Sequence, residues 1–447
     1  MFKLKTLIFE NGERYPILIG QDEMPHFYTT LYVTAKLRSS LAVNSISNRL
    51  KALLCLFEWE NKRNRCLATE FEQEKFLTSA DISDLRDHLK INVSSQKKSD
   101  LRETHVSNRV LNIAGARKVV TTIATVGRNH HYNRMTCVAE YLHFIATITN
   151  QYRNNSNTTR VIDKMAKDIK KARPKGKGKN VAAEIDDSVL SDGLLAEFMD
   201  VAEPTHPLNP FTNTTVKNRN YLMFRLIKET GIRRGELLSL ELTFLELTGD
   251  KPSIWVRRKH DDKFDPRSQQ PVSKTKERKL PIKKETATLL DNYILSERAV
   301  TPNANKHPYL FITHRKCKTQ GQPVSISYFD NAVIPKMKAV DTRFSVIHAH
   351  LFRHEWNVDF SEKIDLENEI RSIPLTEGKS SKPQIDPADE AKMRKNLMGH
   401  SSEKSGDVYN QRYIRKQANE IVLAEQEELQ EKIKNRITAR TANEQIK

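Results

Sequence analysis

Cysteine is scarce in this chain, with four residues among 447. Their positions are Cys55, Cys66, Cys137 and Cys317, and no two of them form a CxxC pair. Such wide spacing suggests neither a disulfide framework nor a zinc site, because both depend on cysteines in recognisable patterns. We therefore expect reduced, packed thiols.

Long apolar stretches are also missing. No run is long enough to span a bilayer, which takes about 20 apolar residues, and no basic amphipathic anchor stands out. The first residues, MFKLKTLIFENGERYP, lack the apolar core and the small-residue cleavage site of a signal peptide. These absences argue against a membrane partner, and the expected location is the cytoplasm.

Positive charge, by contrast, is abundant. Lys and Arg number 74 against 56 Asp and Glu, which leaves a formal net charge of +18. An excess of this size attracts polyanions, and nucleic acid is the commonest of them. With 447 residues the chain is also long enough for two or three domains, each with its own core.

The first third of the chain predicts a hairpin and then a helical domain. Alternating apolar and polar residues on both sides of Asn11-Gly12 predict a hairpin extension over residues 1–25, with Pro16 on an edge strand. Apolar residues at helical spacing then predict a basic, all-helical domain over residues 26–166. Its helices are expected around 43–57, 78–89, 106–126 and 135–148, the second of them opened by a capping box at Thr78 and Asp81.

A basic run follows this domain. Residues 167–180, KDIKKARPKGKGKN, combine self-repelling cations with Pro174, Gly176 and Gly178, so they predict an extended linker, which we bound at 167–186. Such a linker is also suited to follow a DNA backbone.

Residues 187–416 predict a second domain, mostly helical with a few strands. Helices are expected at 189–201, 216–229 (ended by Gly231) and 234–240, and strands at 242–247, 253–258 and 279–282. Residues 370–388 are rich in Pro, Ser, Lys and Asp and predict a mobile insertion. The charged segment 417–447 predicts a helical tail that packs on a partner subunit.

Four motifs in the second domain carry residues suited to chemistry. TGIRRGELLSL places Arg233 at a turn between two helices, and SKTKER places Lys274 at the tip of a strand pair. HAHLFRH holds His350 and Arg353 three apart, which puts them on one face of a helix. The last motif, LMGHSSEKSGDVYNQRY at 397–413, contains His400 and Tyr409.

The first and the last of these motifs also have a purely structural interpretation. Gly399 is suited to end a helix, Tyr409 to pack as a half-buried aromatic, and Arg233 to pair with Glu236 on the surface. A tyrosine hydroxyl, with a pKa near ~10, also needs cationic partners before it can act as a nucleophile. The motifs become more informative together than one by one.

In this chain order, Arg, Lys, His-x-x-Arg, Gly-His and Tyr, the motifs resemble the signature of the tyrosine recombinase (lambda-integrase-like) family. The resemblance covers residues 187–416, and the helical domain ahead of it looks like the core-binding domain of the family in architecture only. It implies a mainly α fold with a small β-sheet in the catalytic domain, and two domains that form a clamp on DNA.

The resemblance also implies a function. It is that of a site-specific recombinase or integrase, which cuts and rejoins duplex DNA through a 3′-phosphotyrosyl intermediate, without metal, ATP or another cofactor, to integrate or excise a mobile element. Its partners would be double-stranded DNA and further copies of itself, as a tetramer on two sites, with accessory DNA-bending proteins or related recombinases as additional ones. The setting would be the bacterial cytoplasm, at the nucleoid.

The residue types fit this chemistry. Guanidinium groups match the oxygens of a phosphodiester that gains negative charge, and a lysine on a hairpin can protonate the leaving 5′ oxygen. By the family pattern, the roles are phosphate binding for Arg233, Arg353 and His400, general base for His350, general acid for Lys274 and nucleophile for Tyr409.

Some alternatives stay open at this point. Lys276 and Lys259 compete with Lys274, and Tyr413 competes with Tyr409. The interval between Arg353 and His400 is also longer than is usual in the family.

Three rival functions remain as well. A type IB topoisomerase uses a similar residue set, and an idle DNA-binding subunit would keep only the fold. A metal-dependent nuclease would use His348, His350 and His354, although no HExxH spacing supports it.

Overall fold

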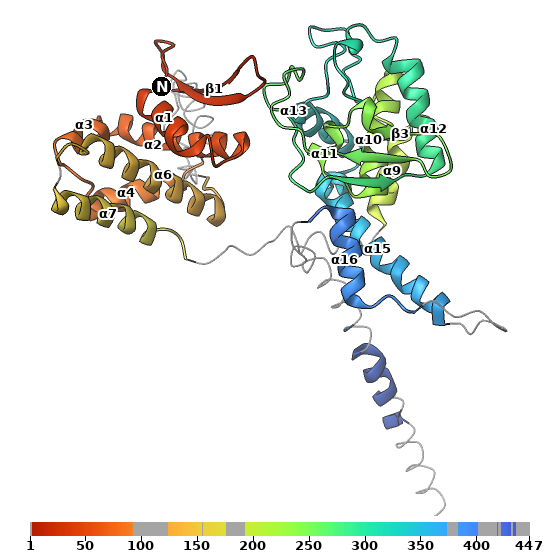
Figure 1. Cartoon of the computed structure of the whole chain (residues 1–447). Coiled ribbons are helices and arrows are strands. Elements are labelled where there is room, and N and C mark those ends of the chain that lie inside the picture. The colour runs from red at the N-terminus through yellow and green to blue at the C-terminus, as the bar shows by residue number, and fades with distance from the viewer. Residues whose placement is uncertain are drawn as a thin grey trace, which may run out of the picture. The chain divides into compact units, whose positions relative to one another are not determined.

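The computed structural model describes residues 2–92, 124–153, 155–175, 193–372 and 383–400, and within the tail residues 418, 422–430 and 432–434. The chain divides into two compact units, Met1–Asn180 and Val181–Lys447 (Figure 1). Helices dominate both, and the strands form one two-stranded and one three-stranded sheet. The predicted fold class, mainly α with a small sheet in the second unit, is confirmed. No described helix has both the length and the apolarity needed to cross a membrane.

The first unit opens with the predicted hairpin. Strands β1 (Lys3–Ile8) and β2 (Arg14–Ile19) are antiparallel, with Lys3 opposite Ile19 and Ile8 opposite Arg14. The turn between them uses Gly12 at φ 87°, a left-handed conformation that favours glycine. β2 faces the core of the unit and β1 is more exposed, so the hairpin caps the helices behind it.

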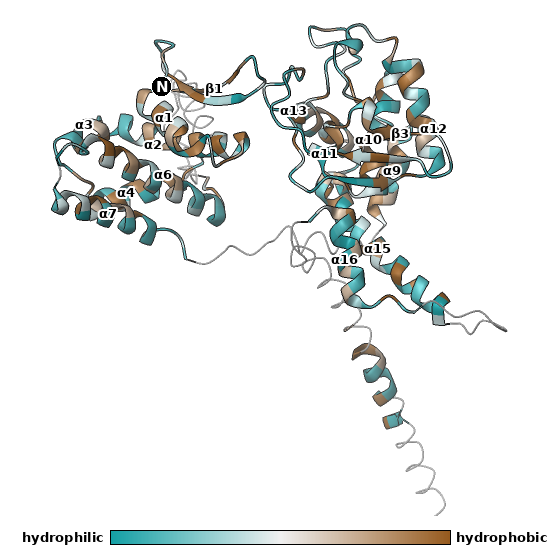
Figure 2. Cartoon of the chain, viewed as in Figure 1, coloured by the Kyte–Doolittle hydropathy of each residue, from teal (hydrophilic) through white to brown (hydrophobic). Residues whose placement is uncertain are grey.

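Amphipathic helices make up the rest of this unit, and Figure 2 shows apolar and polar residues on the same helices. Thr78 and Asp81 form the predicted capping box, and Trp59 is fully buried in the core. The helix expected around 106–126 lies mostly outside the described residues. The helices are α1 (Phe27–Tyr32), α2 (Val43–Lys62), α3 (Leu67–Glu72), α4 (Ser79–Lys90), α6 (Arg128–Thr149) and α7 (Ser156–Lys171), with a π-helical turn at Val33–Leu37.

The predicted linker requires a correction at its start. Helix α7 continues to Lys171, so residues 167–171 are helical and not extended. The reason is burial, because Ile162, Met165 and Ile169 follow one helix face into the core and hold the last turn of α7 in place. The division between the two units falls farther on, at residue 180.

The second unit surrounds its small sheet with helices. Its core contains the rings of Phe198, Phe224 and Phe352, and Phe224 on α10 stacks on Phe352 of α15 with ring centroids 6.0 Å apart. The helices are α9 (Leu194–Ala202), α10 (Thr214–Thr230), α11 (Arg234–Leu238), α12 (Lys284–Asn292), α13 (Ile326–Tyr328), α14 (Ile334–Lys338), α15 (Ala349–Ser372) and α16 (Pro387–Met398).

The sheet has the antiparallel order β3 (Leu245–Glu246), β4 (Ser253–Val256) and β5 (Arg278–Pro281). The strand expected over 242–247 is wrong in its first half, since Leu242–Phe244 is a 3-10 turn. Its backbone hydrogen bonds explain the difference. The N–H of Leu242 bonds Pro308 O and that of Phe244 bonds Glu241 O, so neither pairs with β4.

The expected mobile insertion at 370–388 is wrong at both ends. Helix α15 runs on to Ser372, and α16 begins at Pro387. The side chain of Asn368 pairs with the backbone of Ile385, donating to its O at 3.0 Å and accepting from its N at 2.7 Å. These contacts fix residues 383–386 against α15, and residues 373–382 lie outside the described part.

Two other expectations concern cysteine and the tail. All four cysteines are free thiols, but only Cys55 is buried, and Cys66 and Cys317 are exposed, so the expectation of packed thiols is wrong for these two. In the tail, the described residues 422–430 and 432–434 are helical, with Leu429 and Ile433 exposed.

Candidate active site

Arg233 lies at the turn between α10 and α11, as the sequence predicts. Gly231 ends α10 at φ 62°, and Arg233 then precedes the first residue of α11. The backbone N–H of Arg233 donates to Glu236 Oε2 at 3.0 Å, and its Nη1 lies 3.6 Å from Glu236 Oε1. The side chain of Arg233 is about one third exposed (32%), so it is partly open to solvent.

Glu236, one helical turn on, is almost fully buried. It accepts hydrogen bonds from Thr275 Oγ1 at 2.5 Å and from Arg278 Nη2 at 2.8 Å. Burial by itself raises the pKa of this carboxyl, but the charge of Arg278 and the hydrogen bonds lower it further, to a net value below the ordinary one. Glu236 is therefore ionised and joins the Arg233 turn to the segment around residue 275.

Lys274 belongs to the loop between β4 and β5. It stands four residues before Arg278, the first residue of β5, so it is not at the tip of the strand pair as expected. Its neighbours Ser273 and Thr275 are buried, whereas Lys274 and Lys276 are both exposed. Both lysines are therefore accessible to solvent, and burial does not choose between them.

Arg353 is fully buried on α15. Its Nη1 donates to Gly231 O at 2.6 Å and its Nη2 to Met398 O at 3.0 Å, which joins the end of α10 to the end of α16. The same Nη2 lies 3.2 Å from His400 Nε2. Two arginines distant in sequence therefore approach one histidine, since His400 also senses the charge of Arg233.

His400 follows Gly399, which ends α16 at φ 64° as predicted. Burial and the charges of Arg353, Arg233 and Arg278 lower the pKa of His400 to about 4. The ring is therefore neutral at physiological pH. Because a guanidinium only donates, Nε2 of His400 accepts from Arg353 and the ring proton lies on Nδ1.

His350 lies on α15 one turn before Arg353, but the two differ in exposure. His350 is exposed, and its ring meets that of His354 edge-on with centroids 4.5 Å apart. The structure thus brings Arg233, Arg353 and His400 together and holds Lys274 near them through its neighbours, with His350 at the surface. Tyr409 and Tyr413 lie outside the described residues.

Three residues of this site were not predicted from the sequence. Ser273, Thr275 and Arg278 are all buried and bond to Glu236 or to one another. A possible signal was the alternation of small polar residues with lysines before β5. Nothing local links Arg278 to Glu236, which is 42 residues earlier.

Among the described residues, no group of three or more His, Cys, Asp or Glu side chains is arranged to hold a metal ion. His348, His350 and His354 accordingly do not form such a group.

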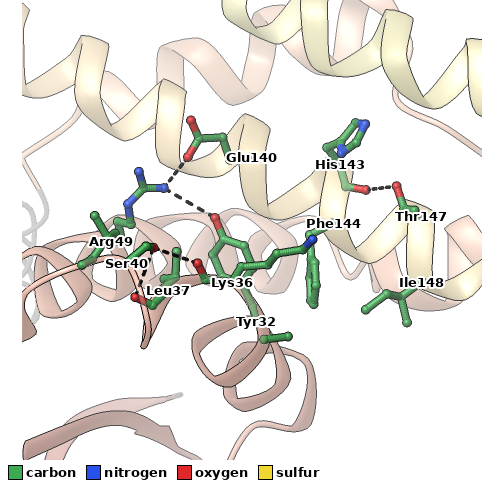
Figure 3. Close-up of a pocket in the computed structure, with 12 residues that line it drawn as sticks. Tyr32, Lys36, Leu37, Ser40, Arg49, Glu140, His143, Phe144, Thr147 and Ile148 are labelled. Carbon is green, nitrogen blue, oxygen red and sulfur yellow. Dashed lines mark hydrogen bonds and ion pairs between the residues drawn. The ribbon is translucent and has the colours of Figure 1, made fainter.

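A separate hollow of about 560 Å³ lies in the first unit (Figure 3). Leu37 and Phe144 form part of its wall, and Arg49 at its edge pairs with Glu140 and approaches the hydroxyl of Tyr32 at 3.5 Å. Burial raises the pKa of Tyr32 to about 12, so this hydroxyl stays protonated. Among the described residues, none of those expected to act on DNA lines the hollow.

Residues 202–367 match the family model described as the phage integrase family. The second unit of the chain thus contains a domain that matches the phage integrase family. The match contains Arg233, Lys274, His350 and Arg353, and it ends before His400. The resemblance seen in the sequence and the enzyme class it implies, a tyrosine-type site-specific recombinase, are thereby confirmed.

Solved structures of recombinases are similar to this recombinase at low identity. The XerH site-specific recombinase bound to difH substrate, in a pre-cleavage complex, is 15% identical with a TM-score of 0.31, over 66% of this chain and 70% of that one. The Tn1549 transposon integrase (residues 82–397) in complex with circular intermediate DNA is 12% identical with a TM-score of 0.38, over 86% and 93%. A comparison with curated proteins finds no match.

Proposed function

We propose that this recombinase cuts and rejoins duplex DNA at a specific site through a 3′-phosphotyrosyl intermediate, without metal or ATP, to integrate or excise a mobile element. The observation that carries the proposal is the cluster of Arg233, Arg353 and His400. Burial and then the charges of Arg353, Arg233 and Arg278 lower the pKa of His400 to about 4, and these arginines supply the positive charge that a phosphodiester requires.

The arginines would bind the scissile phosphate. Negative charge grows on the non-bridging oxygens as the phosphorus is attacked, and a guanidinium can bind two such oxygens at once. Arg353 is oriented for this task by the carbonyls of Gly231 and Met398, and Arg233 by its backbone bond to Glu236. His400, neutral and fixed by Arg353, would be a further phosphate ligand.

Proton transfer would use the remaining residues. Tyr409 attacks phosphorus and forms the O–P bond, while the bond from phosphorus to the 5′ oxygen breaks. His350 takes the proton of Tyr409, and Lys274 gives a proton to the leaving 5′ oxygen. The phosphotyrosyl bond conserves the energy of the phosphodiester, so rejoining needs no ATP.

Covalent trapping tests the proposal. Wild-type protein, Tyr409→Phe and Tyr413→Phe would be expressed in cells that carry the source element, denatured rapidly, and the DNA-linked protein digested and analysed by mass. We expect a phosphotyrosyl peptide at Tyr409 in wild type and in Tyr413→Phe, and none in Tyr409→Phe. An adduct on Tyr413 would reassign the nucleophile, and no adduct in wild type would refute the mechanism.

We also propose the assembly that such a reaction requires. Two units joined by a basic segment would grip duplex DNA, and a tetramer would hold two sites, in the bacterial cytoplasm at the nucleoid. The tail would contact a neighbouring copy. Deletion of residues 425–447 should then abolish synapsis of two sites in a gel-shift assay and leave binding to one site intact. Unchanged synapsis would contradict this role of the tail.

A further inference from the structure

The end of helix α16 is held by two other segments of the second unit. Arg278 Nε donates to Leu397 O at 2.6 Å, Arg353 Nη2 to Met398 O at 3.0 Å, and Lys276 N to Gly399 O at 3.1 Å. The last carbonyls of a helix have no partner within the helix, so such partners fix where it ends. His400 follows directly, and its position is therefore set from the β4–β5 loop as well as from α15.

Arg278 is the centre of the connection to the loop. Besides Leu397 O, it donates to Glu236 Oε2 at 2.8 Å and to Thr275 Oγ1 at 2.7 Å, and it lies 3.5 Å from Lys276 O. Its side chain is almost entirely buried, at 6% exposure. One guanidinium thus joins the turn of Arg233, the loop of Lys274 and the end of α16.

The loop around Lys274 is fixed by the same contacts. Thr275 binds both Glu236 and Arg278, and Ser273 Oγ lies 3.0 Å from Thr275 Oγ1. Both chain neighbours of Lys274 are therefore buried and hydrogen-bonded, while Lys274 itself is exposed. A long lysine side chain has many rotamers, so a fixed backbone on each side is what limits the volume its amine can reach.

This arrangement leaves no room for a side chain at position 399. A Cβ at this position would lie 2.9 Å from Arg278 Nη1, 2.9 Å from Thr275 Cβ and 3.0 Å from Lys276 O. The backbone at the end of α16 thus approaches residues 273–278, which we call the lysine loop, as closely as a residue without a side chain permits.

We propose that Arg278 is a positioning residue that places Lys274 for proton donation to the leaving 5′ oxygen. It does so by fixing the loop of Lys274 relative to His400. The inference rests on the proposed function. Arg278 itself is buried and acts through the loop, so it differs from the residues that touch the phosphate. Lysine cannot replace it fully, because one ammonium cannot reach acceptors on three separate segments.

A change of leaving group separates this role from a merely structural one. The substrate would be a duplex oligonucleotide that carries the recovered recombination site, with either oxygen or sulfur as the bridging 5′ atom at the scissile phosphate. A thiolate leaves without a proton, because thiols are far more acidic than alcohols. Loss of the proton donor, or of its position, therefore slows cleavage of the oxygen substrate and spares the sulfur substrate.

The measurement is the single-turnover cleavage rate of Arg278→Lys. Lys274→Ala is the reference, because it removes the proposed general acid. We expect Lys274→Ala to cleave the oxygen substrate about 10²- to 10⁴-fold more slowly than wild type, and Arg278→Lys about 10- to 100-fold more slowly. Both should cleave the sulfur substrate at nearly the wild-type rate. DNA affinity of Arg278→Lys should be unchanged, because Arg278 is buried.

Arg298→Lys is the matched structural control. Arg298 is also buried and donates to the carbonyls of Ala304, His307 and Tyr309, away from the site. Its lysine variant should lower the melting temperature without a difference between the two substrates. Thr275→Val removes the contacts of the loop with Glu236 and Arg278 without leaving a buried charge unpaired. It should cleave the oxygen substrate slowly and the sulfur substrate at nearly the wild-type rate, even where Arg278→Lys folds poorly.

The outcomes are distinct. The positioning role would be overturned if Arg278→Lys and Thr275→Val cleaved the oxygen and the sulfur substrate with the same loss of rate. It would also be overturned if neither variant cleaved the oxygen substrate more slowly than wild type. Failure of the wild-type protein to cleave either substrate would instead overturn the proposed function itself.

Discussion

Replacement of Gly399 by alanine measures how closely helix α16 meets the lysine loop. Gly399 has φ 64°, and a left-handed conformation costs an alanine about 1 to 2 kcal/mol. The new Cβ would also press on Arg278, Thr275 and Lys276 O at 2.9 to 3.0 Å. Overpacking of this kind costs about 1 to 3 kcal/mol, so the total loss of unfolding free energy is about 2 to 5 kcal/mol.

Gly193 supplies a control for the backbone contribution. It has φ 65°, and a Cβ there would meet nothing within 4 Å. Gly193→Ala should therefore lose only the conformational part, about 1 to 2 kcal/mol. The excess loss in Gly399→Ala then reports the contact with the loop.

Thermal unfolding of the full chain, followed by tryptophan fluorescence, gives the comparison. Trp255 and Trp356 report on the second unit. For a unit of this size, 1 kcal/mol shifts the melting temperature by about 2 to 4 °C, so Gly399→Ala should melt roughly 2 to 12 °C below Gly193→Ala. DNA cleavage should also slow in Gly399→Ala alone, because His400 moves. Equal melting temperatures would refute the close approach of Gly399 to the loop.

Three further predictions concern ionisation and metals. The pKa of His400 is lowered to about 4, so on acidification His400 takes up a proton in the unfolded chain before it does so in the folded one. The free energy of unfolding should therefore fall by up to about 3 kcal/mol between pH 6.5 and 4. Urea titrations of wild type and His400→Gln should show this fall in wild type only. Burial raises the pKa of Glu355 to about 7, so its ionisation destabilises the fold as pH rises. Glu355→Gln should be more stable than wild type by about 1 to 2 kcal/mol above pH 7 and equal to it below pH 4.5; a constant difference would contradict this. Cleavage should survive excess EDTA, since in the proposed chemistry guanidinium groups take the place of metal ions; loss of cleavage that Mg²⁺ restores would contradict this chemistry.

The helix ends of the site were predictable because their causes are local. Gly231 and Gly399 both end helices in the left-handed conformation that their sequence context suggests. The capping box at Thr78 follows the same rule. The family signature was also readable, since it consists of short motifs in a fixed order, and the position of Arg233 at its turn followed from it.

The contacts between the motifs were not predictable. Glu236 looked like the surface partner of Arg233, yet its carboxylate is buried and bound by Arg278 and Thr275, which come from a distant loop. The spacing of His350 and Arg353 predicted one shared face but not that only Arg353 would be buried. Burial depends on which element packs against the helix, and no local pattern contains that information.

The site draws its residues from four stretches of the second unit, around 231–236, 273–278, 353 and 397–400. The hydrogen bonds from Arg353 to Gly231 and Met398, and those from Thr275 and Arg278 to Glu236, cross from one stretch to another. A nascent, truncated or partly unfolded chain therefore lacks the constellation altogether. For a protein whose proposed reaction cuts DNA, this dependence ties the capacity to cut to complete folding of the second unit.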